Sequence, residues 1–299
     1  MMILRLEDNL LSGELADCWM NWQKLSTLNL GNNKFIRNLP SSIGSIRWLQ
    51  SLHLRKNHLS GILPTSLKNC TSLTTFDVAE NWFVGNIPIW IGQEVLGKNS
   101  LSGRIPETIG VMTSLESLDF SANQLTGEIP LVISGLTFLS HLNLSNNNLT
   151  EKIPTSTQLQ SFDASSFVGN DLCGSPLPKN CTSAILTPAN DHSGGKNGNE
   201  HEVDWFYVGM ALGCVVGFWS IIGPLLVNRR WRYLYLFRAG YGGNVPHNIG
   251  NILSNLQYLD LGNNSNIRAE NLGWLSGLSL LKYLDLSFMD IKKSLIGCG

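Results

Sequence analysis

The sequence predicts an α/β, β-rich solenoid of 24-residue coils together with a single transmembrane α-helix, and two markers support the solenoid. Asparagines recur every 24 residues, with one step of 18, at positions 9, 33, 57, 81, 99, 123 and 147. Prolines keep the same register at positions 40, 64, 88, 106, 130 and 154. Two independent markers with one shared period of this length indicate a protein of stacked repeats.

Within each repeat, leucines alternate with polar residues, as Leu28 and Leu30 do with Thr27 and Asn29. A period of two is that of a short strand with one buried face, and one coil cannot close a core without a neighbour. The pattern therefore predicts a leucine-rich-repeat solenoid over residues 1–160, with about seven coils, one of them shortened near residues 89–99. An amphipathic helix or coiled coil is the alternative, but it needs a leucine step near 3.5 and is broken by regular Gly and Pro.

The remaining repeat positions have predictable roles. Asparagines such as Asn33 and Asn57 are expected to form a ladder after each strand, because an amide can both donate to and accept from backbone groups that water cannot reach. Gly61, Gly103 and Gly127 are expected in backbone conformations closed to other residues. The proline that follows ends strand pairing, because it has no N–H group.

Composition argues against several classes of function. A net charge of −1 gives no electrostatic case for binding nucleic acid. The six cysteines contain no C-x-x-C pair and no Cys/His cluster at zinc spacing, so no structural metal and no cofactor are expected. The histidines are scattered along the chain.

The chain is not expected to be an enzyme. Gly92, Gly97 and Lys98 match the start of a phosphate-binding loop, but the next residue must be Ser or Thr, and Asn99 is instead a repeat asparagine. No kinase signature follows residue 227. No Ser/His/Asp set or carboxylate pair can be placed in one site from the sequence.

Residues 205–227 form a run of 23 residues without a formal charge. As a helix this run is about 35 Å long, enough to cross a bilayer core of roughly 30 Å, and a buried soluble helix is the alternative. Acidic residues precede the run in a polar stalk (183–204), and arginines follow it in a basic juxtamembrane segment (228–239). The positive-inside rule then predicts a single-pass plasma-membrane protein with its solenoid outside and its carboxyl terminus in the cytoplasm.

Three glycines, Gly209, Gly213 and Gly217, recur at a spacing of four within this run. Such a face lets a second helix approach backbone to backbone in lipid, so it is predicted to pack against a partner helix. Gly is also common in membrane helices in general, which is the alternative reading of the spacing.

Residues 161–182 depart from the repeat and contain Cys173 and Cys181. Their position after the last regular coil predicts a disulfide-closed cap over the leucine core, in an oxidising compartment. Unpaired thiols are the alternative. Cys18 and Cys70 are expected to be buried free thiols. Glycosylation sequons stand at Asn69, Asn143, Asn148 and Asn180.

These features resemble the plant leucine-rich-repeat receptor-like proteins, above all the group that includes the fungal-xylanase receptors. The resemblance rests on the Leu-x-Gly-x-Ile-Pro repeats, the stretch 112–121, the stretch 170–177, the acidic stalk, the glycine-rich run and the Arg-Arg-Trp-Arg at 229–232. It implies a plasma-membrane receptor for microbial elicitors that lacks its own kinase. It also implies a membrane-spanning receptor kinase as partner, engaged through Gly209, Gly213 and Gly217.

The chain also departs from that family. Charge in residues 1–8 comes too early for a signal peptide, and the amino-terminal cap is absent, so an exposed leucine core is expected at this end. Residues 240–299 look like the family's first repeats, yet they follow the predicted span. As cytosolic coils they are expected to be unstable, because about three or more coils are needed, and Asn263 should stay unglycosylated there. Two joined genes or a rearranged remnant would explain the order.

The ligand is expected on the concave strand face, from strand positions that lie between the leucines. These positions mix both charges with hydroxyls and amides, which suits a peptide, protein or saccharide and selects none of them. They are Arg5, Glu7, Thr27, Asn29, Ser51, His53, Arg55, Thr75, Asp77, Ser117, Asp119, His141 and Asn143. For any one of them a merely solvated position is the alternative. A nonfunctional fragment, or a wall-associated inhibitor of microbial hydrolases, is the alternative for the whole chain.

Overall fold

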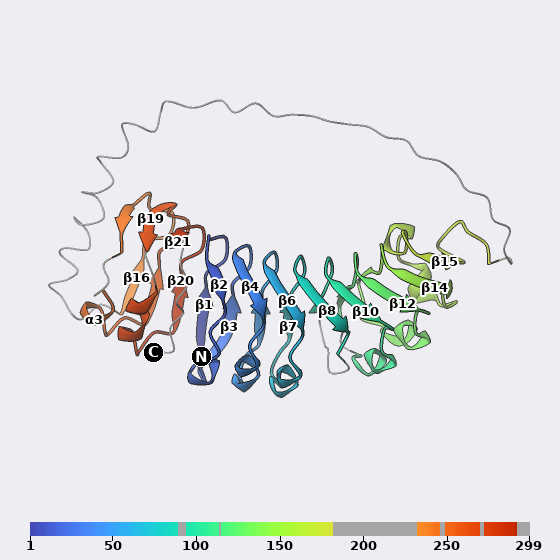
Figure 1. Cartoon of the computed structure of the whole chain (residues 1–299), viewed down its shortest axis with the longest axis horizontal. Coiled ribbons are helices and arrows are strands. Elements are labelled where there is room, and N and C mark those ends of the chain that lie inside the picture. Colours follow the sequence, from blue (N-terminus) through green and yellow to red (C-terminus); the bar gives the residue numbers. More distant parts are fainter. Residues whose placement is uncertain (89–93, 114, 182–231, 246–248, 270–271, 292–299) are drawn as a thin grey trace, which may run out of the picture.

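The computed structural model of the chain describes residues 1–88, 94–113, 115–181, 232–245, 249–269 and 272–291. These residues form one solenoid of parallel strands (Figure 1). The predicted stalk, the run 205–227 with its three glycines, and residues 228–231 of the predicted juxtamembrane segment lie outside the described residues. Within the described part of the chain, no helix has the length and apolar character that a membrane crossing requires.

Ten strands form the first sheet, and every pair in it is parallel because each coil repeats the same right-handed turn. In spatial order its strands are β13 (His141–Asn143), β11 (Ser117–Asp119), β9 (Glu94–Val95), β7 (Thr75–Asp77), β5 (Ser51–His53), β3 (Leu25–Asn29), β1 (Met2–Arg5), β20 (Tyr283–Asp285), β18 (Tyr258–Asp260) and β16 (Tyr233–Tyr235).

A second sheet has eight strands, and a third has three. The second runs β15 (Asp171–Cys173), β14 (Asn148–Lys152), β12 (Gln124–Gly127), β10 (Ser100–Gly103), β8 (Trp82–Asn86), β6 (His58–Ile62), β4 (Lys34–Asn38) and β2 (Ser12–Glu14). The third runs β17 (Gly242–Asn244), β19 (Asn266–Ala269) and β21 (Asp290–Ile291). Gly61 and Gly103 in the second sheet have φ of 74° and 78°, as the repeat pattern predicts.

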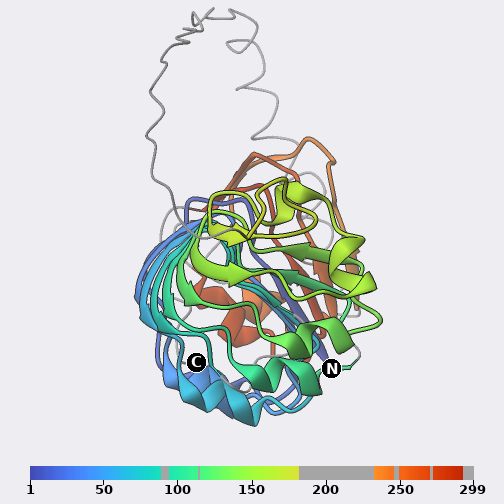
Figure 2. The ribbon, with the colours of Figure 1, turned by 90° about the vertical axis from the view of Figure 1, so that its right-hand side faces the viewer.

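Short helical turns complete the coils and stack one behind another along one side (Figure 2). The repeat proline precedes four of these turns, η2 to η5. Pro40, for example, has φ of −67°, which fits helix entry, and its carbonyl accepts from the N–H of Ile43 at 3.3 Å. The turns are η1 (Trp19–Asn21), η2 (Ser41–Ser45), η3 (Thr65–Asn69), η4 (Glu107–Val111), η5 (Leu131–Gly135), α1 (Thr157–Gln160), η6 (Ala164–Ser166), α3 (Ile249–Ile252) and η8 (Gly273–Gly277).

The asparagine ladder is confirmed. Asn33 donates from Nδ2 to the carbonyls of Leu6 (2.9 Å) and Leu30 (3.1 Å), and its Oδ1 accepts from the N–H of Leu11 (3.0 Å). One amide therefore satisfies backbone groups of two adjacent coils inside the core. Across the shortened coil, Asn99 accepts from the N–H of Phe83 at 3.0 Å, so the ladder continues although six residues are missing from the period.

The carboxyl-terminal coils stack on the first coil of the chain. Strand β20 pairs with β1 in the register Ile3↔Tyr283, Leu4↔Leu284 and Arg5↔Asp285. One hydrophobic core contains buried residues from both segments, including Leu4 and Leu284. Figure 1 shows the orange and red coils beside the blue coil that contains β1. The solenoid thus runs, in space, from residues 232–291 to residues 1–181, and we call the β20–β1 contact the seam.

The seam corrects three expectations. The leucine core at the amino terminus is not left exposed, because β20 covers it with a complete coil. The carboxyl-terminal coils are not an isolated unstable pair, because they share the core of the longer stack. They also begin before residue 240, since Tyr233–Tyr235 of the predicted juxtamembrane segment forms β16.

The disulfide between Cys173 and Cys181 is confirmed, with a Cα–Cα distance of 5.1 Å. It closes the segment in which β15 pairs with β14 and in which Phe167 and Leu172 are buried. Cys70 is a buried free thiol as expected, and burial raises its pKa to about 11. The expectation for Cys18 is wrong, because this residue is disulfide-bonded.

Candidate ligand-binding face

The predicted strand residues lie together on the solvent side of the ten-stranded sheet, which we call the ten-strand face. Strand pairing sets them in two rows that cross the seam. The first row is Tyr233, Tyr258, Tyr283, Ile3, Thr27, Ser51, Thr75, Ser117 and His141. The second row is Tyr235, Asp260, Asp285, Arg5, Asn29, His53, Asp77, Val95, Asp119 and Asn143. Glu7 and Arg55 follow their strands by two residues.

Sequence reasoning missed the members of these rows that come from residues 232–291. The signal was present, because Tyr258-Leu-Asp-Leu261 and Tyr283-Leu-Asp-Leu286 repeat the alternation of the other strands. They were left out because the predicted span placed them on the other side of a membrane. Their pairing with β1 makes them part of the same face.

In the middle of the face, polar side chains interact with one another. The Ser51 hydroxyl and Nε2 of His53 are 2.7 Å apart. Burial raises the pKa of Asp77 above its ordinary value, and the negative charge of Asp119 adds to this, while the Ala79 N–H, Arg55 and His53 act against it. The negative charge of Asp119 thus makes ionisation of Asp77 less favourable.

Arg55 is tied into an ion-pair group with Glu80 and Lys98. Its Nη2 lies 2.5 Å from Glu80 Oε1, and Lys98 Nζ lies 3.6 Å from the same oxygen. Burial opposes the Glu80 charge, but the hydrogen bond and charge of Arg55, helped by Lys98, lower the pKa of Glu80. Arg55 thus stabilises the bend after its strand as well as facing solvent.

At the seam, residues from both segments form one polar group. Arg5 donates from Nε (3.0 Å) and Nη2 (2.6 Å) to Oε1 of Glu7, and its Nη1 lies 3.4 Å from Oδ2 of Asp285. Oδ2 of Asp285 also accepts from the Tyr283 hydroxyl at 3.1 Å. Burial lowers the pKa of Arg5, but Glu7 and Asp285 outweigh it and hold that pKa above its ordinary value.

Three tyrosines stack in a ladder beside this group. The ring centroids of Tyr233 and Tyr258 are 4.9 Å apart at an interplanar angle of 21°. Those of Tyr258 and Tyr283 are 6.1 Å apart at 22°. Directly paired aromatic residues on neighbouring strands stabilise a sheet and give it a rigid aromatic surface.

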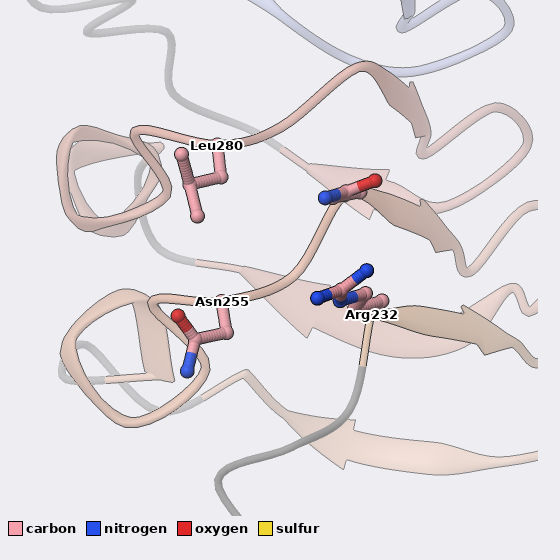
Figure 3. Close-up of a pocket in the computed structure, with 4 residues that line it drawn as sticks. Arg232, Asn255 and Leu280 are labelled. Carbon is pink, nitrogen blue, oxygen red and sulfur yellow. The ribbon is translucent and has the colours of Figure 1, made fainter.

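An open cavity of about 470 Å³ lies beside the starts of β16 and β18. Arg232, Asn255, Gln257 and Leu280 line it, and Figure 3 shows Asn255 and Leu280 beside the short helical turns and Arg232 across from them on the strand side. None of these residues was predicted to bind a ligand. Among the residues that the structure describes, no cluster of His, Cys, Asp or Glu is arranged to hold a metal ion.

The four predicted glycosylation residues differ in exposure. Asn69, Asn148 and Asn180 are exposed. Asn143 is half-buried in β13, and its side-chain oxygen accepts from the Ser145 hydroxyl at 2.7 Å. A glycan is therefore easier to place on the first three residues than on Asn143.

Comparison with known proteins agrees with the observed fold. The family model "Leucine Rich Repeat" matches residues 24–46 and 48–70, and the model "Leucine Rich repeats (2 copies)" matches residues 113–167. The receptor kinase HAESA of Arabidopsis, solved as an ectodomain with an extended IDA peptide hormone, is similar with a TM-score of 0.55 and 34% identity. That similarity covers 61% of this chain and 31% of the HAESA chain.

Two curated tomato (Solanum lycopersicum) proteins are also similar. Receptor-like protein EIX2 is 48% identical and receptor-like protein EIX1 is 43% identical, each over 88 residues. The match covers 27% of this chain and 8% of each relative's length. The strand register and the family models show a leucine-rich-repeat solenoid, and these relatives make the chain similar to plant leucine-rich-repeat receptor-like proteins.

Proposed function

We propose that this chain is a cell-surface receptor-like protein that binds an extracellular peptide on its ten-strand face. The observation that carries the proposal is the pair of mostly polar rows that run from β16 to β13 across one sheet, with Ile3 in the first row and Val95 in the second as the apolar positions. The similar HAESA ectodomain was solved with a peptide hormone, which supports a peptide over a saccharide. A long row of amides, hydroxyls and charges suits an extended peptide, because the row can contact several of the peptide's side chains in turn.

The seam bears on how the chain is placed at a membrane. A single crossing at residues 205–227 would put residues 1–181 and 232–291 on opposite sides, whereas β1 and β20 belong to one sheet. The cytoplasmic location expected for the carboxyl terminus does not fit this pairing within one molecule. We therefore propose that both repeat segments lie outside the cell, and that residues 205–227 attach the chain to the plasma membrane without separating them.

The signalling step is also part of the proposal. We propose that signalling uses a membrane-spanning receptor kinase as partner, and that Gly209, Gly213 and Gly217 of the membrane-attached run 205–227 pack against it. From the resemblance of the sequence to the fungal-xylanase-receptor group we propose a role in plant defence against microbial elicitors, and the similar EIX1 and EIX2 are likewise receptor-like proteins.

Photo-crosslinking tests the binding face. A photoreactive residue would replace Ser51 or Ser117 on the ten-strand face, or Ser102 in β10 of the second sheet as a matched control. The full chain would be expressed in plant membranes and exposed to a labelled fungal elicitor peptide fraction. We expect labelling from the first two positions and not from the third. Equal labelling at all three positions, or labelling at Ser102 alone, would contradict the proposal.

A further inference from the structure

The seam holds more negative than positive side chains. Glu7, Asp260 and Asp285 face one guanidinium, that of Arg5, and we call these four residues with Tyr283 the seam cluster. Arg5 directs two N–H groups to one oxygen of Glu7. The other oxygen, Oε2, is buried and has no hydrogen-bond partner, and Glu7 as a whole is only 8% exposed. A buried carboxylate oxygen without a donor is costly, so it is ready to accept one.

Asp260, on the neighbouring strand β18, adds to this excess of negative charge. It is half-buried, and Oδ1 accepts one hydrogen bond, from the Gly262 N–H at 3.0 Å. Burial raises the pKa of Asp260, and the negative charge of Asp285 raises it further, against the opposing effects of the Gly262 N–H and Arg5. The single positive charge of Arg5 therefore does not neutralise the three carboxylates of the seam cluster.

The tyrosine ladder adds a second feature that favours a cation. Tyr258 and Tyr283 occupy the row beside Asp260 and Asp285, and their rings are stacked at 6.1 Å. Aromatic rings attract guanidinium and ammonium groups, and a carboxylate that solvent reaches, as that of half-buried Asp260, can accept from the N–H donors of such groups. The described residues form no metal-holding group here, so the fitting cation is one that brings its own donors.

We propose that the seam cluster is a subsite for a cationic side chain, arginine or lysine, of the peptide bound along the ten-strand face. This inference rests on the proposed function, and it adds one defined element of ligand specificity. The subsite exists only when the two segments of the chain are stacked, because Arg5 and Glu7 come from one segment and Asp260, Tyr283 and Asp285 from the other. A segment of 1–181 alone would lack the tyrosines and two of the three carboxylates.

The test uses the full chain in lipid nanodiscs at low salt and two short probes, acetyl-Gly-Arg-Gly-amide and the same peptide with citrulline in place of arginine. Citrulline keeps the shape and removes the charge. We expect the arginine probe to bind at least about fivefold more tightly than the citrulline probe, because only it gains the charge attraction. Equal affinity of the two probes, or no binding of either, would overturn the proposal.

Asp260→Asn identifies the site, and Asp163→Asn, which lies outside the ten-strand face, is its matched control. Each aspartate accepts from a backbone N–H two residues on, of Gly262 (3.0 Å) and of Ser165 (2.8 Å), a bond that the amide oxygen of Asn can also accept. We expect Asp260→Asn to weaken the arginine probe by at least about fivefold and Asp163→Asn to leave it unchanged. Equal effects of the two variants would overturn the subsite. Labelling from Ser51 and Ser117 is independent of this result, so the proposed function can stand when the subsite falls.

Discussion

Asn9 and Leu286 lie 277 positions apart in the sequence, yet Nδ2 of Asn9 donates to the Leu286 carbonyl at 2.8 Å. Oδ1 of Asn9 accepts from the N–H of Met289 at 3.2 Å. These are the bonds that Asn33 makes to the coil before it, so the ladder continues across the seam without a change of geometry. The carboxyl-terminal coils therefore occupy the place of preceding repeats.

Replacing Asn9 by alanine is expected to loosen the seam. The change leaves buried backbone groups of Leu286 and Met289 without partners, which costs about 1–3 kcal/mol. Limited proteolysis should then release residues 232–291 earlier than in the parent chain. Asn57→Ala, in the middle of the stack, should lower stability without this selective release. Identical cleavage patterns for the two variants would contradict the role of Asn9.

Asn263 is expected to carry a glycan when the chain is expressed in plant membranes. It begins an Asn-x-Ser sequon, it is exposed, and the seam puts it on the same side as Asn180. Asn263→Gln and Asn180→Gln should each remove one glycan-sized step from the mobility of the protein on a gel. A glycan on Asn180 with none on Asn263 would support a crossing between them and argue against the seam in the cell.

Removing the cap disulfide is expected to destabilise the end of the stack. The bridge closes a loop of 8 residues, for which chain entropy predicts roughly 2–3 kcal/mol. Replacing both Cys173 and Cys181 by serine should lower the free energy of unfolding in denaturant by about this amount. Added reductant should have no further effect on the cap of this variant, whereas it should destabilise the cap of the parent chain.

The ion pairs of Glu80 predict a loss of stability in acid. Because the pKa of Glu80 is lower in the folded than in the unfolded chain, the folded chain binds its proton less readily. The stabilisation is therefore complete above the ordinary pKa of 4.5 and disappears as the pH falls through the folded value. Glu80→Gln should lower the free energy of unfolding at pH 7 and have little effect at strongly acidic pH.

Asp77 serves as a control, because its pKa is shifted in the opposite direction to that of Glu80. The pKa of Asp77 is higher in the folded than in the unfolded chain, so folding disfavours its ionised form. The contribution of Asp77 to the free energy of unfolding therefore becomes less favourable as the pH rises. Asp77→Asn should therefore be neutral or stabilising at pH 7, where Glu80→Gln is destabilising. Parallel pH curves for the two variants would contradict the assignment of these shifts.

Gly213→Leu is expected to disrupt association with a receptor kinase. A leucine at the centre of the glycine face would keep a second helix from close approach in lipid. Co-purification of a membrane kinase with the variant should fall well below that with the parent chain. Ala211→Leu, which lies between two of the glycines on another side of a helix, is the control and should leave association unchanged.

The sequence predicted those parts of the fold that repeat locally. Asn33 and Gly61 could be assigned their roles because each recurs at the spacing of one coil and contacts the next coil along the chain. The pairing of Cys173 with Cys181 followed for the same reason, since both lie in one short segment after the last coil. The polar residues of the ten-strand face between β1 and β13 were found by the same alternation.

The seam was not predictable in this way. The alternation in Tyr283-Leu-Asp-Leu286 shows that its coil needs neighbours on both sides, but it does not say which neighbours. The apolar run 205–227 predicts a membrane crossing between this coil and β1, so the sequence favoured placing the two apart despite the similarity of their repeats. Cys18 was misjudged for a related reason, because its position in a coil says nothing about a distant bonding partner.

The sequence by itself therefore determined the coil, its ladder and its buried face, because these depend on side chains within one repeat of each other. Only the tertiary structure decided that residues 232–291 precede Met2 in the stack and complete a polar cluster around Arg5. The physical reason is that open coil ends are alike: each exposes leucines and unpaired backbone groups, and the end that meets it is set by packing in three dimensions.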